Sequence, residues 1–243
     1  MRKGYIEATD KVRRFYADVS VTQINGGFGV SLDGKTLRTP KGAPLVLPSR
    51  GLAERVAEDW SRQGEVLDQA GMHATRLANT AVEAVAVARE AVAQSFADYA
   101  GSDVLCYYAD SPAALVARQH GLWSPLLDRA DRELGLTFVR VEGVIHRPQP
   151  PQTLARVREL AAASDDITLA GLAFGMSLFG SAVLSLGLQR GWMNGEEAFD
   201  LSRLDEAWQE EQWGVDEEAA ERTARLREEA IFLERWFKAA AQA

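Results

Sequence analysis

From Gly29 to Thr36 the chain reads GVSLDGKT, and the structure of this short stretch decides the class of the N-terminal fold. As a string it matches G-x-x-x-x-G-K-[ST], the glycine-rich loop that cradles nucleotide phosphates. As a pattern, Val30 and Leu32 alternate with other residues and lead into an Asp-Gly pair, which indicates a strand, a tight turn and a returning strand. A phosphate loop requires a helix directly after the motif, whereas a hairpin requires a second strand.

The residues after the motif favour the hairpin. A phosphate loop holds its ligand with the free N–H groups of a helix N-terminus. Here LRTPKGAPLVLP follows, and Pro40 and Pro44 forbid a helix. Asp33 would also repel a bound phosphate, and the chain lacks the alternating strand and helix pattern of nucleotide-binding enzymes. We therefore expect a hairpin and no cofactor; the alternative is a P-loop nucleotide-binding enzyme that uses residues 29–36.

The N-terminal part of the chain predicts a mixture of strands and helices. Apolar residues alternate with polar ones from Val19 onward, and Ser49 is the expected N-cap of a helix that ends near Gly64. Residues 73–99 have almost no helix breakers and predict one long helix or two in series. The runs SDVLCYY and LTFVRVEGVI have the composition of strands, and two separate helices are expected to open at Pro112 and Pro125.

The segment RPQPP at residues 147–151 is the clearest linker. Every run after it has helical character, at about 152–163, 167–189, 195–212 and 216–240. We therefore predict an α+β protein with a β-rich mixed N-terminal domain over residues 1–147 and an all-α helical C-terminal domain over residues 152–243.

The run of residues 167–188 carries no charge and is long enough to span a membrane. It contains Gly171 and Gly175 in a G-x-x-x-G motif, which lets helices pack closely. An apolar helix with small residues is equally expected at the centre of a soluble helical domain. Because other helical segments surround it in the sequence, we interpret it as a buried core helix without membrane insertion.

Composition limits the possible functions. The 243 residues carry a net charge of −8, which argues against nucleic-acid binding. Cys106 is the only cysteine, and the three histidines are scattered, so we expect no metal site. Motifs for nucleophilic catalysis are absent. With no apolar leader at its start, the chain is expected to be cytoplasmic.

The stretch SRLDEAWQEEQWG at residues 202–214 is the strongest candidate for a binding surface. On a helix, Leu204 and Trp208 would share an inward face, and Glu206, Glu210 and Trp213 would share another. Carboxylates beside an aromatic side chain can recognise Lys or Arg on a partner protein. The alternative is an ordinary amphipathic helix with a solvated acidic face.

The runs RRFYADVSVTQINGGFGVSLDGKTLRTPKGAPLVLPS, AEDW and SRLDEAWQEEQWG together resemble the ATP synthase assembly chaperones of the Atp-twelve family. The resemblance extends from about Arg13 to Phe237. It implies a chaperone that is not an enzyme, that binds the unassembled alpha subunit of the F-type ATP synthase, and that prevents its aggregation until the beta subunit replaces the chaperone. It also implies a β-rich N-terminal domain and a helical C-terminal domain.

The resemblance places the functional carboxylates in the acidic stretch, where Glu206 and Glu211 are the matching positions. With the residues chosen from the pattern, the expected partner-binding set is Glu206, Glu210, Glu211 and Trp213. After Gly214 this chain reads VDEEAAERT, where family members tend to carry a His-Asp pair. Any role of that pair therefore does not transfer to this chain.

Overall fold

The computed structural model of the protein describes residues 12–143, 145–214 and 217–242. Its strands are β1 (Val19–Ile24), β2 (Gly27–Leu32), β3 (Lys35–Thr36), β4 (Tyr107–Tyr108) and β5 (Val141–Glu142). Its α-helices are α1 (Arg50–Ser61), α2 (His73–Thr80), α3 (Ala86–Ala100), α4 (Ala113–Leu134), α5 (Pro151–Ala162), α6 (Asp166–Phe179), α7 (Ala182–Gln189), α8 (Gly195–Ser202), α9 (Leu204–Trp213) and α10 (Glu217–Ala240). A π-helical turn, Ala81–Val85, joins α2 to α3, and a short 3-10 helix, Val104–Cys106, precedes β4. The fold is α+β, as predicted.

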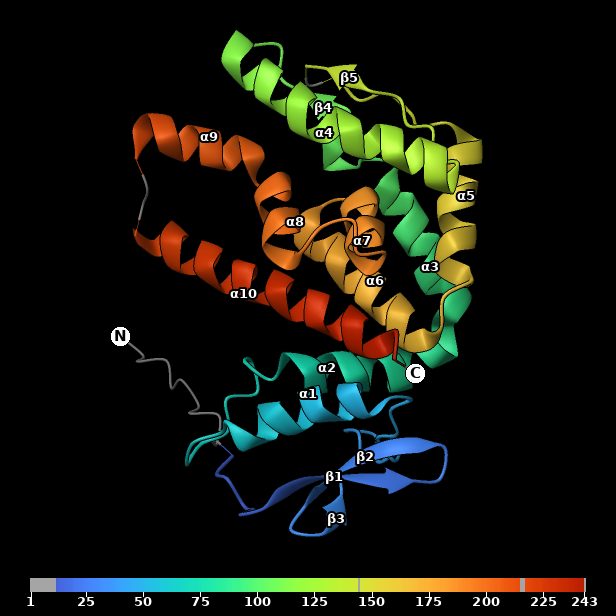
Figure 1. Cartoon of the computed structure of the whole chain (residues 1–243), viewed down its shortest axis with the longest axis vertical. Helices are drawn as coiled ribbons and strands as arrows, with labels where there is room; N and C mark the ends of the chain where they lie inside the picture. Colours follow the sequence, from blue (N-terminus) through green and yellow to red (C-terminus); the bar gives the residue numbers. More distant parts are fainter. Residues whose placement is uncertain (1–11, 144, 215–216, 243) are drawn as a thin grey trace, which may run out of the picture.

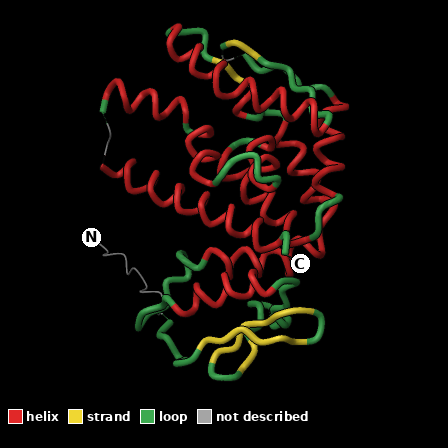
Figure 2. The backbone as a smooth tube through the Cα atoms, viewed as in Figure 1, coloured by secondary structure: helices red, strands yellow, loops and turns green. Residues whose placement is uncertain are grey.

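The sheet β1-β2-β3 lies at one end of the molecule, and α1 and α2 separate it from the other helices (Figure 1). Helices α6 and α7 occupy the centre. Helices α3 and α5 pack on each other along one side, and α4 covers the end opposite the sheet (Figure 2). The division of the chain into two domains at residues 147–152 stays a prediction. The expectation that the chain has no leader concerns residues 1–11, which lie outside the described residues.

GVSLDGKT forms a hairpin. Strand β2 pairs antiparallel with β1 and with β3, and Leu32 lies opposite Lys35 across the turn. The turn residue Asp33 has a φ of 48°, and its carboxylate accepts the backbone N–H groups of Ala17 and Asp18 at 3.0 and 2.8 Å. The next helix along the chain begins only at Arg50, so no helix directly follows the motif as a phosphate loop requires. The hairpin prediction is confirmed.

Ser49 anchors α1 as predicted and also joins it to the far end of the chain. Its hydroxyl accepts the N–H of Leu52 and donates to the carbonyl of Ala239 in α10 at 2.7 Å. This hydroxyl is buried, so it satisfies one free group at the start of α1 and one at the end of α10. The sheet and α1 are thereby fixed against the helical part.

The apolar run forms two helices instead of the single helix that we predicted. Gly180, with a φ of 63°, ends α6, and Ser181 caps α7. Nearly every side chain of α7 and most of those of α6 are buried. A Cβ at Gly171 would lie 2.6 Å from Cε1 of Phe237, so the small residues do admit a close neighbour. The buried-core interpretation is confirmed, and none of the described helices has the length and apolar character that a membrane span requires.

Three further expectations were wrong in detail. In SDVLCYY and LTFVRVEGVI only β4 and β5 are strands. The side chain of Gln149 bonds both the N–H and the C=O of Val139, at 2.8 and 2.9 Å, and so replaces a partner strand there. Pro125 opens no second helix but lies inside α4. Pro125 has no N–H to donate to the carbonyl of Gly121, four residues earlier in the helix. Both residues are exposed, so water can bond this carbonyl instead.

Candidate functional site

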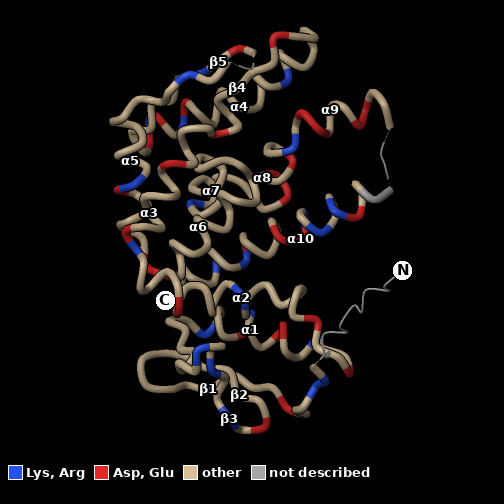
Figure 3. The backbone as a smooth tube through the Cα atoms, turned by 180° about the vertical axis from the view of Figure 1, so that it is seen from behind, with Lys and Arg blue, Asp and Glu red and all other residues tan. Residues whose placement is uncertain are grey.

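The acidic stretch forms α9, which leaves the compact part of the molecule at a sharp corner. We expected one helix over residues 195–212, but Arg203, with a φ of −113° and a ψ of 21°, separates α8 from α9. A capping box of Asn194 and Glu197 starts α8. Glycine at position 214, with a φ of 88°, follows the end of α9. Acidic residues mark α9 in Figure 3, and two of them lie in its first turn, where the helix dipole favours negative charge.

Polar contacts to α4 hold α9 in place. Only Leu204 of α9 is buried, whereas Trp208 is half-buried against the core. The buried amide of Gln119 in α4 donates to Oδ1 of Asp205 at 2.7 Å and accepts the N–H of Ala109 at 2.8 Å. Burial raises the pKa of the Asp205 carboxyl, and the bond from Gln119 partly opposes this change. These polar contacts add to the packing of Leu204 and Trp208 in positioning α9.

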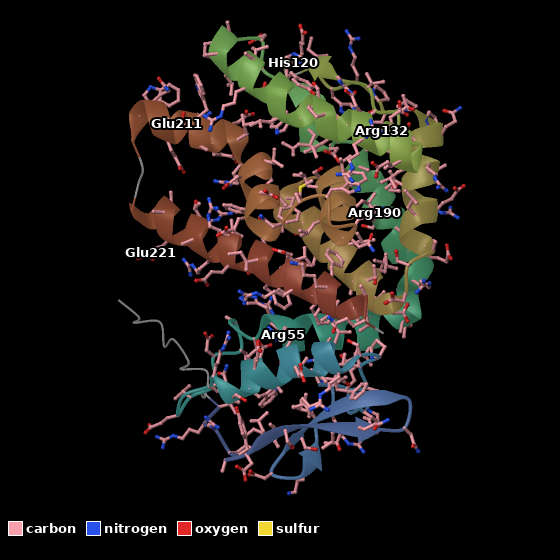
Figure 4. The ribbon with its side chains drawn as sticks, viewed as in Figure 1. Arg55, His120, Arg132, Arg190, Glu211 and Glu221 are labelled. Atoms are coloured by element: carbon pink, nitrogen blue, oxygen red, sulfur yellow. The ribbon has the colours of Figure 1, made fainter. Side chains whose placement is uncertain are left out.

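One ion pair also connects the two helices. Nη1 of Arg118 in α4 lies 2.8 and 2.9 Å from the two carboxylate oxygens of Glu211. Figure 4 labels Glu211 on α9, and both side chains are partly exposed. A pair of this kind stabilises a fold by up to about 1 kcal/mol.

Between α4, α8, α9 and the first half of α10 lies an open groove of about 700 Å³. Apolar side chains form much of its lining, among them Leu122, Leu126 and Phe199. Leu122 is 46% exposed, a large value for a leucine beside a core. Charged side chains from all four helices surround this apolar part. The groove thus combines apolar and ionic contacts, as protein-binding surfaces do.

The predicted residues occupy different parts of this site. Glu206 and Glu210 line the groove, and Glu211 lies beside it in the ion pair with α4. Trp213 is 80% exposed at the end of α9 and does not line the groove. The carboxylates therefore share one site, whereas Trp213 offers a separate apolar contact.

A second hollow, of about 610 Å³, lies between α3 and α6. None of the described residues that line it is charged, so it offers no ionic chemistry. Among the residues that the structure describes, no group of three or more His, Cys, Asp or Glu side chains is arranged to hold a metal ion. The groove beside α9 is therefore the better candidate site.

Comparison with known proteins places this fold. The sequence model described as "ATP12 chaperone protein" matches residues 13–131, from the segment before β1 into α4. The crystal structure of Atp12 from Paracoccus denitrificans is similar over 94% of this chain and 98% of that chain, with a TM-score of 0.86 and 41% identity. The chain belongs to the ATP12 chaperone family.

Two other proteins extend this family relationship. A candidate chaperone from Agrobacterium tumefaciens has a TM-score of 0.87 and 44% identity, over 93% of this chain and 85% of its own. The mitochondrial protein atp12 of Schizosaccharomyces pombe is 24% identical over 221 residues, which cover 86% of this chain and 76% of the relative. The resemblance found in the sequence is thus confirmed at the level of the ATP12 family.

Sequence reasoning missed the residues that complete the site in this ATP12 chain. Arg118 is 93 positions from Glu211, and Gln119 is 86 from Asp205, so no local pattern connects them. Arg227 of α10 reaches Asp200 of α8 at 2.6 Å in the same way. The one sequence signal for these basic residues was the acidic stretch itself, because clustered carboxylates are stabilised by neighbouring cations.

Proposed function

We propose that this chain is an assembly chaperone for the catalytic head of the F-type ATP synthase. It binds the unassembled alpha subunit and prevents the aggregation of that subunit until the beta subunit replaces the chaperone. We also propose that it has no enzymatic activity of its own. The observation that carries the proposal is the likeness to Atp12 of Paracoccus denitrificans over almost the entire chain, at 41% identity. At this identity, we expect a shared role as well as a shared fold.

The groove beside α9 supports a role in binding another protein. An assembly chaperone must cover a surface that is apolar and becomes buried later, and it must release that surface again. An open groove with apolar walls and charged edges suits such contacts, since exposed charges govern association and specificity more than affinity. We therefore propose that Glu206, Glu210, Glu211 and Trp213 contact the client.

A capture experiment tests this proposal. Isolated alpha subunit is passed over the immobilised full chain, and wild type is compared with Glu206→Lys, Glu211→Lys and the control Glu90→Lys. Glu90 is an exposed residue of α3, a helix that lies on the opposite side of the molecule from α9 (Figure 1), and its substitution by lysine changes the net charge equally.

We expect wild type and Glu90→Lys to capture the subunit equally. We expect the two α9 variants to capture less, because each places a lysine beside an arginine and removes a client contact. No capture by wild type would contradict the proposed function, and equal capture by all four proteins would remove Glu206 and Glu211 from the site.

We also propose that the protein works in the cytoplasm of a bacterium. The two relatives with solved structures come from bacteria, whereas the Schizosaccharomyces pombe relative is described as mitochondrial. Fractionation of cells that express the tagged full chain, without detergent, tests this point. Recovery mainly with membranes would contradict it.

A further inference from the structure

The arginines that line the groove are already engaged. Each of them forms an ion pair with a carboxylate of the same protein. The pairs are Arg118–Glu211, Arg203–Glu206 and Arg227–Asp200. Glu197, another acidic residue of the lining, accepts the N–H of Asn194 in the capping box of α8. Each of these four side chains thus has a partner within the protein, although Nε of Arg203 is buried without a hydrogen-bond partner among the described residues.

Glu210 is different. Its half-buried side chain lines the groove, yet its carboxylate has no hydrogen bond or ion pair with any residue that the structure describes. Covering this carboxylate with an apolar surface would remove water from an unpaired charge, which is costly. An occupant of the groove therefore needs a cationic group beside Glu210.

The walls of the groove also restrict the backbone of the occupant. Four helices form most of the lining, with Trp192 and Met193 added by the turn before α8, and the N–H and C=O groups of a helix are bonded along its axis except at the ends. An extended strand would find no sheet edge there to pair with. A helix satisfies its own backbone and can lay one apolar face into a groove, with side chains at positions i, i+3, i+4 and i+7.

The volume of the groove is consistent with one helix face. At about 700 Å³ it can hold several side chains but not an entire helix. Leu122 and Leu126 are four residues apart on α4, so they form one apolar face toward such a guest.

We propose that this groove binds an amphipathic helix of the client, whose apolar side chains enter between α4 and α9 and whose Lys or Arg pairs with Glu210. The identity of the client rests on the proposed function; the chemistry of the groove does not. Glu210 is thus the carboxylate that pairs with the cation of the client, whereas Glu206 and Glu211 meet the client while each stays paired with its own arginine.

Synthetic peptides test the groove without the client. One labelled peptide of about 15 residues, long enough to form a helix in the groove, carries leucines at helical spacing with flanking lysines, and its twin carries glutamates in place of the lysines. Fluorescence anisotropy measures the binding of both peptides to the full chain and to its Glu210→Lys, Leu122→Asp and Glu90→Lys variants.

We expect the wild type to bind the glutamate peptide about tenfold more weakly than the lysine peptide. Glu210→Lys should reverse this preference, Leu122→Asp should weaken binding of both peptides, and Glu90→Lys should bind like the wild type. Because Glu90→Lys and Glu210→Lys have the same net charge, their difference isolates the local effect. Equal binding of both peptides to the wild type, no binding of either, or an unchanged preference in Glu210→Lys would overturn the inference.

Capture of the alpha subunit separates this inference from the proposed function. If the wild type captures the subunit and Glu210→Lys and Leu122→Asp capture it equally well, the client does not occupy the groove, and the inference is wrong while the proposed function stands. If the wild type captures no subunit, the proposed function is wrong, and the peptide preference alone decides the chemistry of the groove.

Discussion

Gly195, the first residue of α8, allows α8 and α10 to approach closely beside the groove. A Cβ added there would lie 2.4 Å from the carbonyl oxygen of Ala230, 2.7 Å from its carbon and 2.8 Å from Cα of Ile231. All three are backbone atoms of α10, so no side chain can rotate away. The N–H of Gly195 also donates to Glu234 at 2.8 Å, which restricts the movement of α8. In Gly195→Ala, one of the two helices must therefore shift.

The size of the effect follows from two opposing contributions. Forcing an extra carbon into a packed site costs about 1 to 3 kcal/mol, and the upper half applies here because backbone must move. Replacing glycine by alanine also restricts the unfolded chain and returns about 0.5 to 1 kcal/mol. We expect Gly195→Ala to lower the free energy of unfolding by about 2 kcal/mol.

Gly121→Ala is the matched control. Gly121 lies inside α4, and a Cβ there would meet no atom within 4 Å. This variant should be more stable than the wild type by about 0.5 to 1 kcal/mol. Urea unfolding followed by far-UV circular dichroism measures all three proteins. If Gly195→Ala is as stable as Gly121→Ala, the close approach of α8 and α10 does not exist in solution.

Three further effects can be measured by the same method. Asp165→Ala removes the carboxylate that caps α6 through the N–H of Thr168 at 2.9 Å, and should cost about 1 kcal/mol; an unchanged midpoint would show that the cap contributes nothing. Burial raises the pKa of Asp103 from 3.8 to about 6, so the stability that its proton provides is complete below pH 3.8 and is lost as the pH rises through about 6. From pH 4 to pH 7 the stability of the wild type relative to Asp103→Asn should therefore fall by about 2 kcal/mol, and a difference that does not change with pH would contradict this. Arg118→Ala should lower stability by less than about 1 kcal/mol, because its pair with Glu211 is partly exposed; a loss above about 2 kcal/mol would show that α9 depends on this pair.

Local patterns predicted the elements whose stability is local. The hairpin at Asp33 followed from alternation and turn chemistry, and the N-cap at Ser49 followed from its position before an apolar repeat. Pro125 and the break at Gly180 were misread. Proline was taken as a start signal, but its surroundings in α4 let the helix continue. The uncharged run hid the point at which a left-handed glycine turns the chain.

The acidic stretch was found as a candidate from sequence, but its role in the site was not. The sequence contains four carboxylates within seven residues, but it does not reveal which of them form ion pairs within the protein. The ion pairs are formed by Arg118 and Arg203, and Arg118 belongs to a helix that is distant in the sequence. Glu210 stands out only when these pairs are known.

By itself, the sequence determined the class of fold, the hairpin in place of a phosphate loop, the buried apolar centre and the family, because periodicity, turn residues and short motifs act over a few positions. Only the tertiary structure decided that α8 and α9 meet at a corner, that four helices enclose a groove, and that the carboxylate of Glu210 has no partner among the residues that the structure describes. The groove depends on contacts such as Arg118–Glu211 and Gln119–Asp205, which join residues 93 and 86 positions apart. Such contacts form when distant segments pack, not when local elements form.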